Sequence, residues 1–186
     1  MQEVDNILRI LKETEKSIKD NDFYKLKQLS NQTIHSAAIS QDPDNIVVAV
    51  LIYALGKILE RTHYREQEGW NEFYTPFVQN LERAITSLEK GDVKRAREAF
   101  GKIRNSINKM EGNLKSSIQD VLKKAELNKA FKIYEHGLSS EQTADLLGVS
   151  LWDLASYIGQ SSISESKINE GINVKKRVQI AEDIFG

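Results

Sequence analysis

The chain has 186 residues, a net charge of −1 and no cysteine. Its length is sufficient for one domain with a large hydrophobic core, or for a helical domain followed by a small module. The lack of cysteine excludes disulfides, thiolate zinc sites and thiol nucleophiles. Since only two prolines and ten glycines are available to interrupt helices, we predict an all-α protein.

The first half of the chain predicts a helical bundle. Residues 3–17 and 23–37 have apolar positions at helical spacing, and a cluster of Asp and Asn residues separates them. Asp42-Pro43 starts a helix, and the sequence that follows, IVVAVLIYALGKIL, is apolar nearly all round, as expected of a central helix. A fourth helix is predicted through residues 70–85, and Pro76 should kink or divide it.

Neither a signal peptide nor a membrane span is predicted. The N-terminus is charged from its third residue, so it lacks the uninterrupted apolar core of a signal peptide. The longest apolar run, residues 46–55, is too short to cross a bilayer. We therefore expect a cytoplasmic protein.

The three histidines do not form the pattern of a metal or catalytic site. His35 is predicted to be a buried or half-buried packing residue, and His136 to act as a cation or donor at a helix C-terminus. Glu60 and His63 have the Glu-x-x-His spacing of di-iron bundles, but such sites need that spacing twice, and the chain has it once. Nucleotide-binding loops and hydrolase motifs are also absent, so we expect no metal, no cofactor and no enzymatic activity.

The positive charge of the chain is concentrated in its middle. Residues 1–82 carry 9 Lys or Arg and 13 Asp or Glu, residues 83–132 carry 13 and 6, and residues 133–186 carry 4 and 8. A fifth predicted helix, apolar on one side, presents a cationic face made of Lys94, Arg95, Arg97, Lys102, Arg104 and Lys109. Such a face suits nucleic-acid phosphates. The alternative is that it pairs with the acidic N-terminal segment or keeps the protein in solution.

The last part of the chain predicts a module of three helices. A long helix should end at Glu135, and we place the boundary between an N-terminal bundle, residues 1–112, and the module, residues 113–186. In GLSSEQTADLLGVSLWDLASYIG, Ser139 and Ser150 can each cap a helix, and Gly148 can adopt the left-handed conformation that ends one. The apolar residues left to share a core are Ala144, Leu147, Val149, Leu154 and Ile158. This is the layout of a helix-turn-helix.

The run QTADLLGVSLWDLASYI resembles the helix-turn-helix of prokaryotic regulators. GVSLWDL is also similar to small prokaryotic antitoxins, and the whole layout resembles uncharacterised archaeal helical proteins. The resemblance implies that the outward positions of the second helix are Leu151, Trp152, Ala155 and Ser156. They include neither a cation nor an amide, the groups that usually read bases. The Leu151/Trp152 surface could therefore contact a protein, lie in the DNA major groove, or pack on the preceding bundle.

The C-terminal residues predict a loop and a last helix. Residues 160–173 are polar and rich in serine, which is typical of a loop, and residues 174–185 return to helical spacing. Lys175-Lys176-Arg177 would lie in the first turn of that helix, where cations oppose the helix dipole, and they indicate an anionic partner.

Two functions are consistent with these features. The first is a non-enzymatic nucleic-acid-binding protein with a regulatory or structural role, in which the helix from Ser150 to Ser156 adds recognition. The residues that would contact phosphates are Lys94, Arg95, Arg97, Lys102 and Arg104. The alternative is an adaptor or antitoxin-like protein that binds another protein through Leu151 and Trp152. Since helix-turn-helix proteins often dimerise, a homodimer is consistent with either function.

Overall fold

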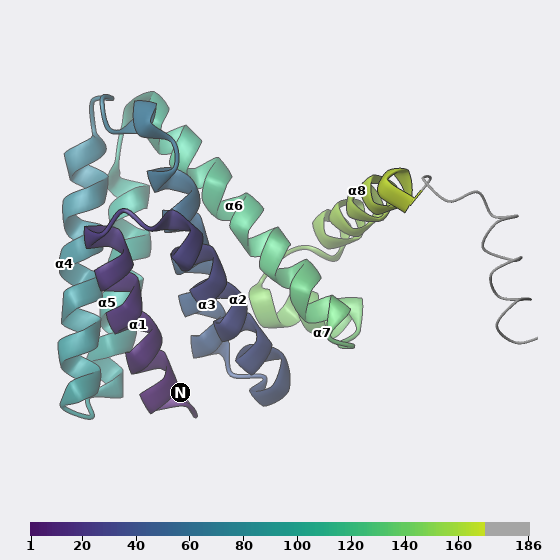
Figure 1. Ribbon diagram of the computed structural model, residues 1–186, viewed down its shortest axis with the longest axis horizontal. Helices are drawn as coiled ribbons and strands as arrows, with labels where there is room; N and C mark the ends of the chain where they lie inside the picture. The colour runs from purple at the N-terminus through teal and green to yellow at the C-terminus, as the bar shows by residue number, and fades with distance from the viewer. Residues whose placement is uncertain (170–186) are drawn as a thin grey trace, which may run out of the picture.

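The computed structural model describes residues 1–169, and the side chains of residues 1–161. Throughout this part the chain is helical and has no strand, so the all-α prediction is confirmed. The helices are α1 (Val4–Lys19), α2 (Phe23–Ser40), α3 (Pro43–Leu59), the short 3-10 helix η1 (Thr62–Tyr64), α4 (Trp70–Glu89), α5 (Val93–Lys109), α6 (Gly112–Glu135), α7 (Ser140–Leu147) and α8 (Leu151–Asn169) (Figure 1). None of these helices is both long enough and apolar enough to cross a bilayer.

Aspartates begin three of the bundle helices. The carboxylate of Asp22 accepts a hydrogen bond of 2.9 Å from a backbone N–H in the first turn of α2. Asp42 and Asp92 do the same at α3 and α5, each at 3.0 Å. A cap of this kind stabilises a helix by about 1 kcal/mol. The predicted start at Asp42-Pro43 is confirmed, since Pro43 is the first residue of α3.

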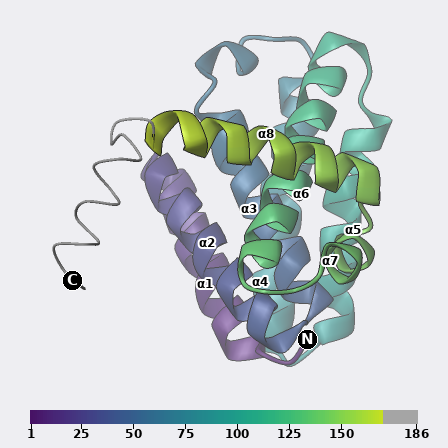
Figure 2. The same cartoon turned by 90° about the vertical axis from the view of Figure 1, so that its right-hand side faces the viewer.

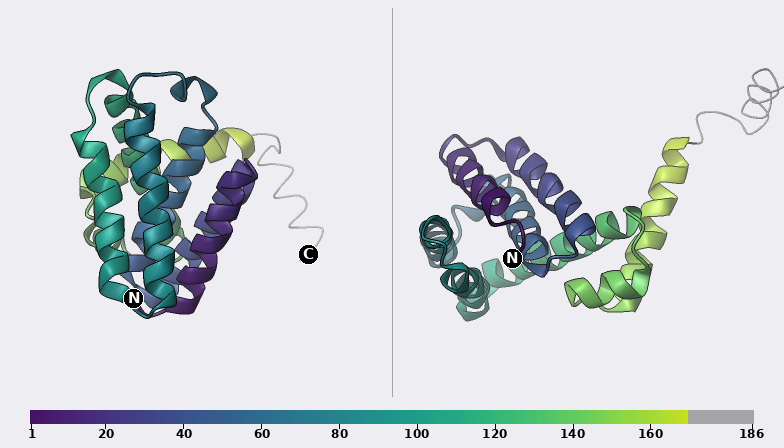
Figure 3. Two further views of the ribbon diagram at one scale, coloured as in Figure 1. Left: turned by 90° about the vertical axis from the view of Figure 1, so that its left-hand side faces the viewer. Right: turned by 90° about the horizontal axis from the view of Figure 1, so that it is seen from below.

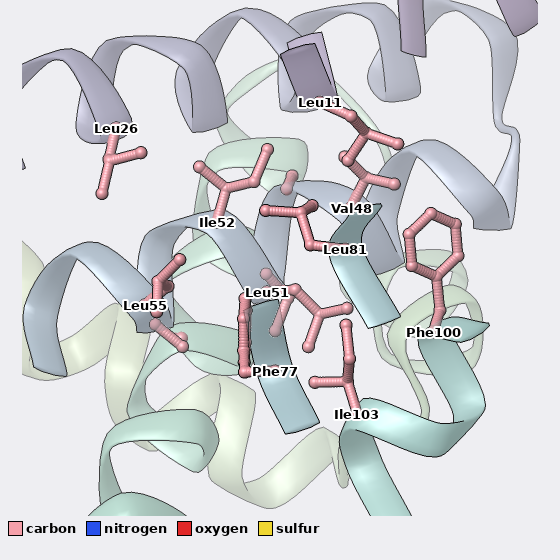
Figure 4. Packing of buried hydrophobic residues seen from close by; sticks show 14 of the residues in the cluster. Leu11, Leu26, Val48, Leu51, Ile52, Leu55, Phe77, Leu81, Phe100 and Ile103 are labelled. Atoms are coloured by element: carbon pink, nitrogen blue, oxygen red, sulfur yellow. The ribbon is translucent and has the colours of Figure 1, made fainter. Parts of the chain in front are cut away.

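The core of the bundle is built around α3. This helix packs against α2 and α6, and more lightly against α1 and α5. Figure 4 shows side chains from α1 to α5 that meet there, among them Leu11, Leu51, Phe77 and Ile103. A helix that is apolar nearly all round must be covered on most sides, and α3 is covered in this way.

The long helix α6 belongs to two hydrophobic clusters. Its side chains Leu114, Ile118 and Val121 are part of the bundle core. Farther along, Ala130 packs with Ala144 of α7 and Leu154 of α8 in a small second cluster. As a result α6 extends out of the bundle and carries α7 and α8 at its far end (Figure 1 and Figure 3). The boundary at residues 112 and 113 stays a prediction, because α6 is continuous from one cluster to the other.

Two sequence-based expectations concern helix boundaries. Pro76 lies inside α4, so of the two predicted outcomes, a kink or a division, the structure excludes the division. The side chain of Asn80 donates a hydrogen bond of 2.8 Å to the Pro76 carbonyl. The expectation of a loop at residues 160–169 is wrong, because these residues continue α8. Their sequence is polar yet contains neither glycine nor proline, so nothing in it stops a helix that has already begun. The predicted last helix, with Lys175-Lys176-Arg177, lies outside the described residues.

Candidate functional site

The turn between α7 and α8 has the local geometry that its sequence predicts. Ser139 and Gln142 form a capping box, in which each side chain accepts a hydrogen bond from the other residue's backbone N–H, at 3.1 and 3.2 Å. Gly148 ends α7 with φ +65°, in the left-handed region. The hydroxyl of Ser150 accepts a hydrogen bond of 3.0 Å from the N–H of Asp153 and so caps α8.

The inner side of α8 is fixed on α6. Leu154 is fully buried, and Val149 and Ile158 pack against its cluster. The side chain of Asn128 in α6 donates a hydrogen bond of 3.1 Å to the Tyr157 hydroxyl. Helix α8 packs on α6 and α7, and Figure 1 and Figure 2 show it crossing α6 at the side away from α4 and α5. Its outer side is therefore held in a defined orientation by packing and polar contacts on the inner side.

The outer side of α8 presents an apolar surface to solvent. Trp152 is 80% exposed and Leu151 46% exposed, and Ala155 beside them is exposed as well. We call these three residues the α8 surface. Successive residues of a helix are separated by about 100°, so Trp152 points almost opposite to the buried Leu154. The interpretation in which Leu151 and Trp152 pack on the bundle is therefore wrong.

Asp153 is the charged residue nearest to the α8 surface in sequence. Its carboxylate lies 3.4 Å from the ammonium group of Lys123 in α6. The cap of α8 is supplied by the Ser150 hydroxyl. The carboxylate of Asp153 therefore fastens the start of α8 to α6 by an ion pair.

Three predicted phosphate contacts of α5 have acidic partners inside the protein. Arg97 binds Asp44 of α3 through Nε and Nη2, with a shortest distance of 2.7 Å. Arg104 forms an ion pair with Glu126 of α6. Arg95 lies 3.6 Å from Asp92, one turn before it on the same helix. The alternative interpretation, pairing with the acidic N-terminal segment, thus holds at Arg97.

The Asp44 carboxylate is the most strongly engaged of these acids. It also lies 2.7 Å from the ammonium group at Met1. Partial burial raises the pKa of Asp44, but hydrogen bonds from Arg97 and from that ammonium group outweigh this, so that the net pKa is lowered. Arg97 is therefore fixed beside α3.

The remaining lysines of the cationic face are different. Lys94, Lys102 and Lys109 are exposed, and none of them forms an ion pair with a residue that the structure describes. They lie along one side of α5 over most of its length. An anionic partner could therefore bind these three lysines without breaking an ion pair inside the described part of the protein.

The histidines lie apart from the α8 surface. His35 is exposed, not buried as predicted, and its ring meets that of His136 edge-on at 5.0 Å between centroids. The prediction of burial is wrong because the position faces outward on α2 beside the end of α6. His63 is exposed and contacts Tyr64. Within the described part of the chain, no three His, Asp or Glu side chains are grouped so that they could hold a metal ion.

Sequence reasoning missed a buried lysine. Lys129 has no exposed surface, its ammonium group donates to the Asn31 side chain at 2.9 Å, and it lies 4.2 Å from the ring centroid of Tyr53. Burial lowers the pKa of Lys129 to about 7, and repulsion from Lys132 and Lys27 acts in the same direction. The spacing offered a signal, because Lys129 lies one turn after the buried Ala125 and one turn before the buried Ile133, on their stripe of α6.

Comparison with protein-family models, with curated proteins and with solved structures found no match for this chain. The resemblances to helix-turn-helix regulators, antitoxins and archaeal helical proteins are therefore carried by the residues quoted above alone. Function has to be argued from the surfaces themselves.

Proposed function

We propose that the chain is a non-enzymatic binding protein that docks another protein on the α8 surface, with α6, α7 and α8 acting as a helix-turn-helix-like module. The observation that carries the proposal is the exposure of Trp152, 80% of whose surface is open to solvent next to Leu151. Tryptophan has one of the largest apolar side chains and is enriched among the residues that dominate binding energy at protein interfaces.

The surroundings of the α8 surface favour a protein over DNA. Helix α7 carries exposed Glu141 and Asp145, and residues 133–161 contain four acidic residues and no Lys or Arg. Acidic groups beside a groove-reading helix would repel phosphates. They complement a partner whose apolar pocket is rimmed by Lys or Arg, because rim charges of opposite sign steer association.

The test is capture of a partner from native extract treated with nuclease, with Trp152→Ala compared to wild type. We expect a nuclease-resistant partner that Trp152→Ala no longer retains, because truncation of a central aromatic residue costs about 2 kcal/mol or more. The matched control is Tyr24→Ala, which removes another exposed aromatic side chain, 70% exposed, on the distant helix α2. Retention of the same partner by Trp152→Ala would refute docking on this surface.

A second function, nucleic-acid binding, is favoured by one observation, the unpaired row of Lys94, Lys102 and Lys109 described above. In this function Arg95, Arg97 and Arg104 would add their charge, since exposed ion pairs are weak and a phosphate can compete for the arginine. Ser156, which is exposed on α8, would add a polar contact, whereas the Ser150 hydroxyl is already engaged as a cap.

Salt dependence separates the two functions. Binding through phosphates weakens steeply with salt, and loss of one phosphate contact reduces the slope of log K against log salt by about 1. We expect Lys102→Glu to weaken nucleic-acid binding in this way, and Lys16→Glu, an exposed lysine of α1, to have no such effect. An affinity that is insensitive to salt, in wild type and in both variants, would rule out this second function.

A further inference from the structure

A cavity of about 350 Å³ lies between α3, α5, α6 and α7. Its volume is within the range of about 300–1,000 Å³ that is typical of small-molecule sites. Its lining is mainly apolar and includes Val47, Val50 and Leu51 of α3, Phe100 of α5, Leu122 of α6 and Leu147 of α7. Its polar boundary is formed by Arg97, Arg104 and their carboxylate partners Asp44 and Glu126. The cavity thus combines an apolar lining with arginines along one edge.

Gly101 borders this cavity on α5, between Arg97 and Arg104. Its backbone is in the ordinary helical region, and a Cβ built on it would meet no atom within 4 Å. Neither backbone conformation nor packing therefore requires a glycine. In the middle of a helix glycine is less favourable than alanine. One consequence of the missing side chain is that the edge of the cavity stays open.

The two arginines offer donors that the protein does not use. Arg97 employs Nε and Nη2 for Asp44, and its Nη1 has no partner among residues 1–161. Arg104 employs Nη2 for Glu126, which leaves its Nε and Nη1 without an acceptor in the same part of the chain. Asp44 uses both carboxylate oxygens, whereas Glu126 uses Oε1 and leaves Oε2 without a partner in the described part of the chain. The unused donors, on three guanidinium nitrogens, outnumber this one unused acceptor oxygen, so the edge matches an anionic group.

We propose that this cavity binds a small molecule with an apolar body and a single carboxylate group. The body lies against the leucine, valine and phenylalanine side chains between α3 and α5, and the carboxylate accepts hydrogen bonds from the free N–H groups of Arg97 and Arg104. Hydrogen bonds between guanidinium and carboxylate are roughly twice as strong as those between neutral groups. A cationic ligand would be repelled by two guanidinium groups, and the carboxylates beside them, Asp44 and Glu126, are already paired with these arginines. This site is independent of the α8 surface and of the proposed docking function.

The test uses decanoate, decanol and decylamine as probes of one shape and three charges, titrated calorimetrically into the full chain below their micelle concentrations. We expect decanoate to bind at least about tenfold more tightly than decanol, because a charge-assisted hydrogen bond contributes at least that factor. Decylamine should bind more weakly than decanol. Comparable affinities for decanoate and decanol would overturn the assignment of a carboxylate ligand.

Variants at Gly101 locate the probe. Gly101→Phe puts a ring over the open edge of the cavity. It should weaken decanoate binding at least about tenfold, because decanoate could then bury much less of its apolar surface. Gly101→Ala adds only a Cβ in free space and should leave the affinity within about twofold. Val47→Trp, on the opposite wall in α3, is a second blocking variant, and circular dichroism establishes that each variant is folded. If both blocking variants bound decanoate as tightly as wild type does, this cavity would not be the binding site.

Removal of both partners of one ion pair tests the polar edge. In Arg104→Gln with Glu126→Gln the arginine donors are lost without leaving an unpaired charge. We expect this variant to bind decanol as wild type does and to lose much of the preference for decanoate. An undiminished preference would show that Arg104 does not hold the carboxylate and would overturn that contact.

Discussion

Lys129 is a fully buried lysine that has no acidic partner among the residues the structure describes. Within that part of the chain its ammonium group has one hydrogen bond, to Asn31, and the face of the Tyr53 ring, and both are weaker substitutes for hydration. Protonation in the folded state is therefore costly, which is why burial lowers the pKa of Lys129 to about 7 from the ordinary 10.5. The free energy of unfolding therefore depends on the protonation of this one side chain between about pH 7 and pH 10.5.

The direction of this link follows from proton binding. Between about pH 7 and pH 10.5 the unfolded chain holds the Lys129 proton and the folded chain releases it, so the free energy of unfolding rises with pH. We expect a rise of about 1 kcal/mol per pH unit from this group, measured by urea unfolding. Lys129→Met should remove that part of the rise and increase stability at neutral pH.

The control for Lys129 is a lysine that is already solvated. Lys16→Met, at an exposed position of α1, should leave the pH dependence of wild type unchanged. If Lys129→Met and wild type showed parallel curves between pH 7 and pH 10, the ammonium group would not be buried as the structure has it.

At the scale of the helix, two glycines that look alike in the sequence have opposite roles. Gly148 takes φ +65° where α7 ends, a conformation that costs other residues about 1–2 kcal/mol. Gly101 lies inside α5 in ordinary helical conformation, with free space where a side chain would be. Gly148→Ala should therefore lower the thermal midpoint, and Gly101→Ala should raise it, with each effect near 1 kcal/mol in stability. Thermal melts followed by circular dichroism measure both, and shifts of the same sign would contradict this assignment.

The predictable features of these helices are those that a few neighbouring residues determine. The caps at Asp42, Ser139 and Ser150 were predicted because a cap requires only a polar side chain and an N–H two or three residues later. The start of α8 is fixed in this way, but its end is not. Residues 160–169 were expected to form a loop on composition, and helix propagation decided otherwise.

Contacts between distant helices were not predictable in the same way. The alternative interpretation of α5 allowed pairing with the acidic N-terminal segment in general, but nothing local selects Asp44 as the partner of Arg97, 53 residues away. The meeting of His35 with His136 and the cavity beside Gly101 likewise depend on how α2, α5 and α6 are placed by the core. Leu154 was expected in a shared core and Leu151 and Trp152 at outward positions. Whether the preceding bundle covers Leu151 and Trp152 could not be predicted, because it depends on where α6 places α8.

At the scale of the whole molecule, α6 decides whether the bundle and the α7–α8 unit unfold together. The second cluster is small, since its buried members are Ala130, Ala144 and Leu154. It is not isolated, however, because Leu138, Leu146 and Leu147 around α7 also pack against the bundle core. A small cluster with no contact to the core would be expected to open by itself. Contact through α7 and a continuous α6 favour a single cooperative transition.

Two probes and one variant test this cooperativity. In Trp152→Phe the fluorescence of the remaining Trp70 reports on the bundle alone, and circular dichroism at 222 nm reports on all helices. We expect the two urea transitions to coincide. Leu154→Ala, which empties the second cluster, should lower both midpoints equally, with a loss of about 2–4 kcal/mol. A loss of helical signal before the fluorescence changes, and a Leu154→Ala effect confined to that early phase, would instead make the α7–α8 unit an independent domain and place the boundary inside α6.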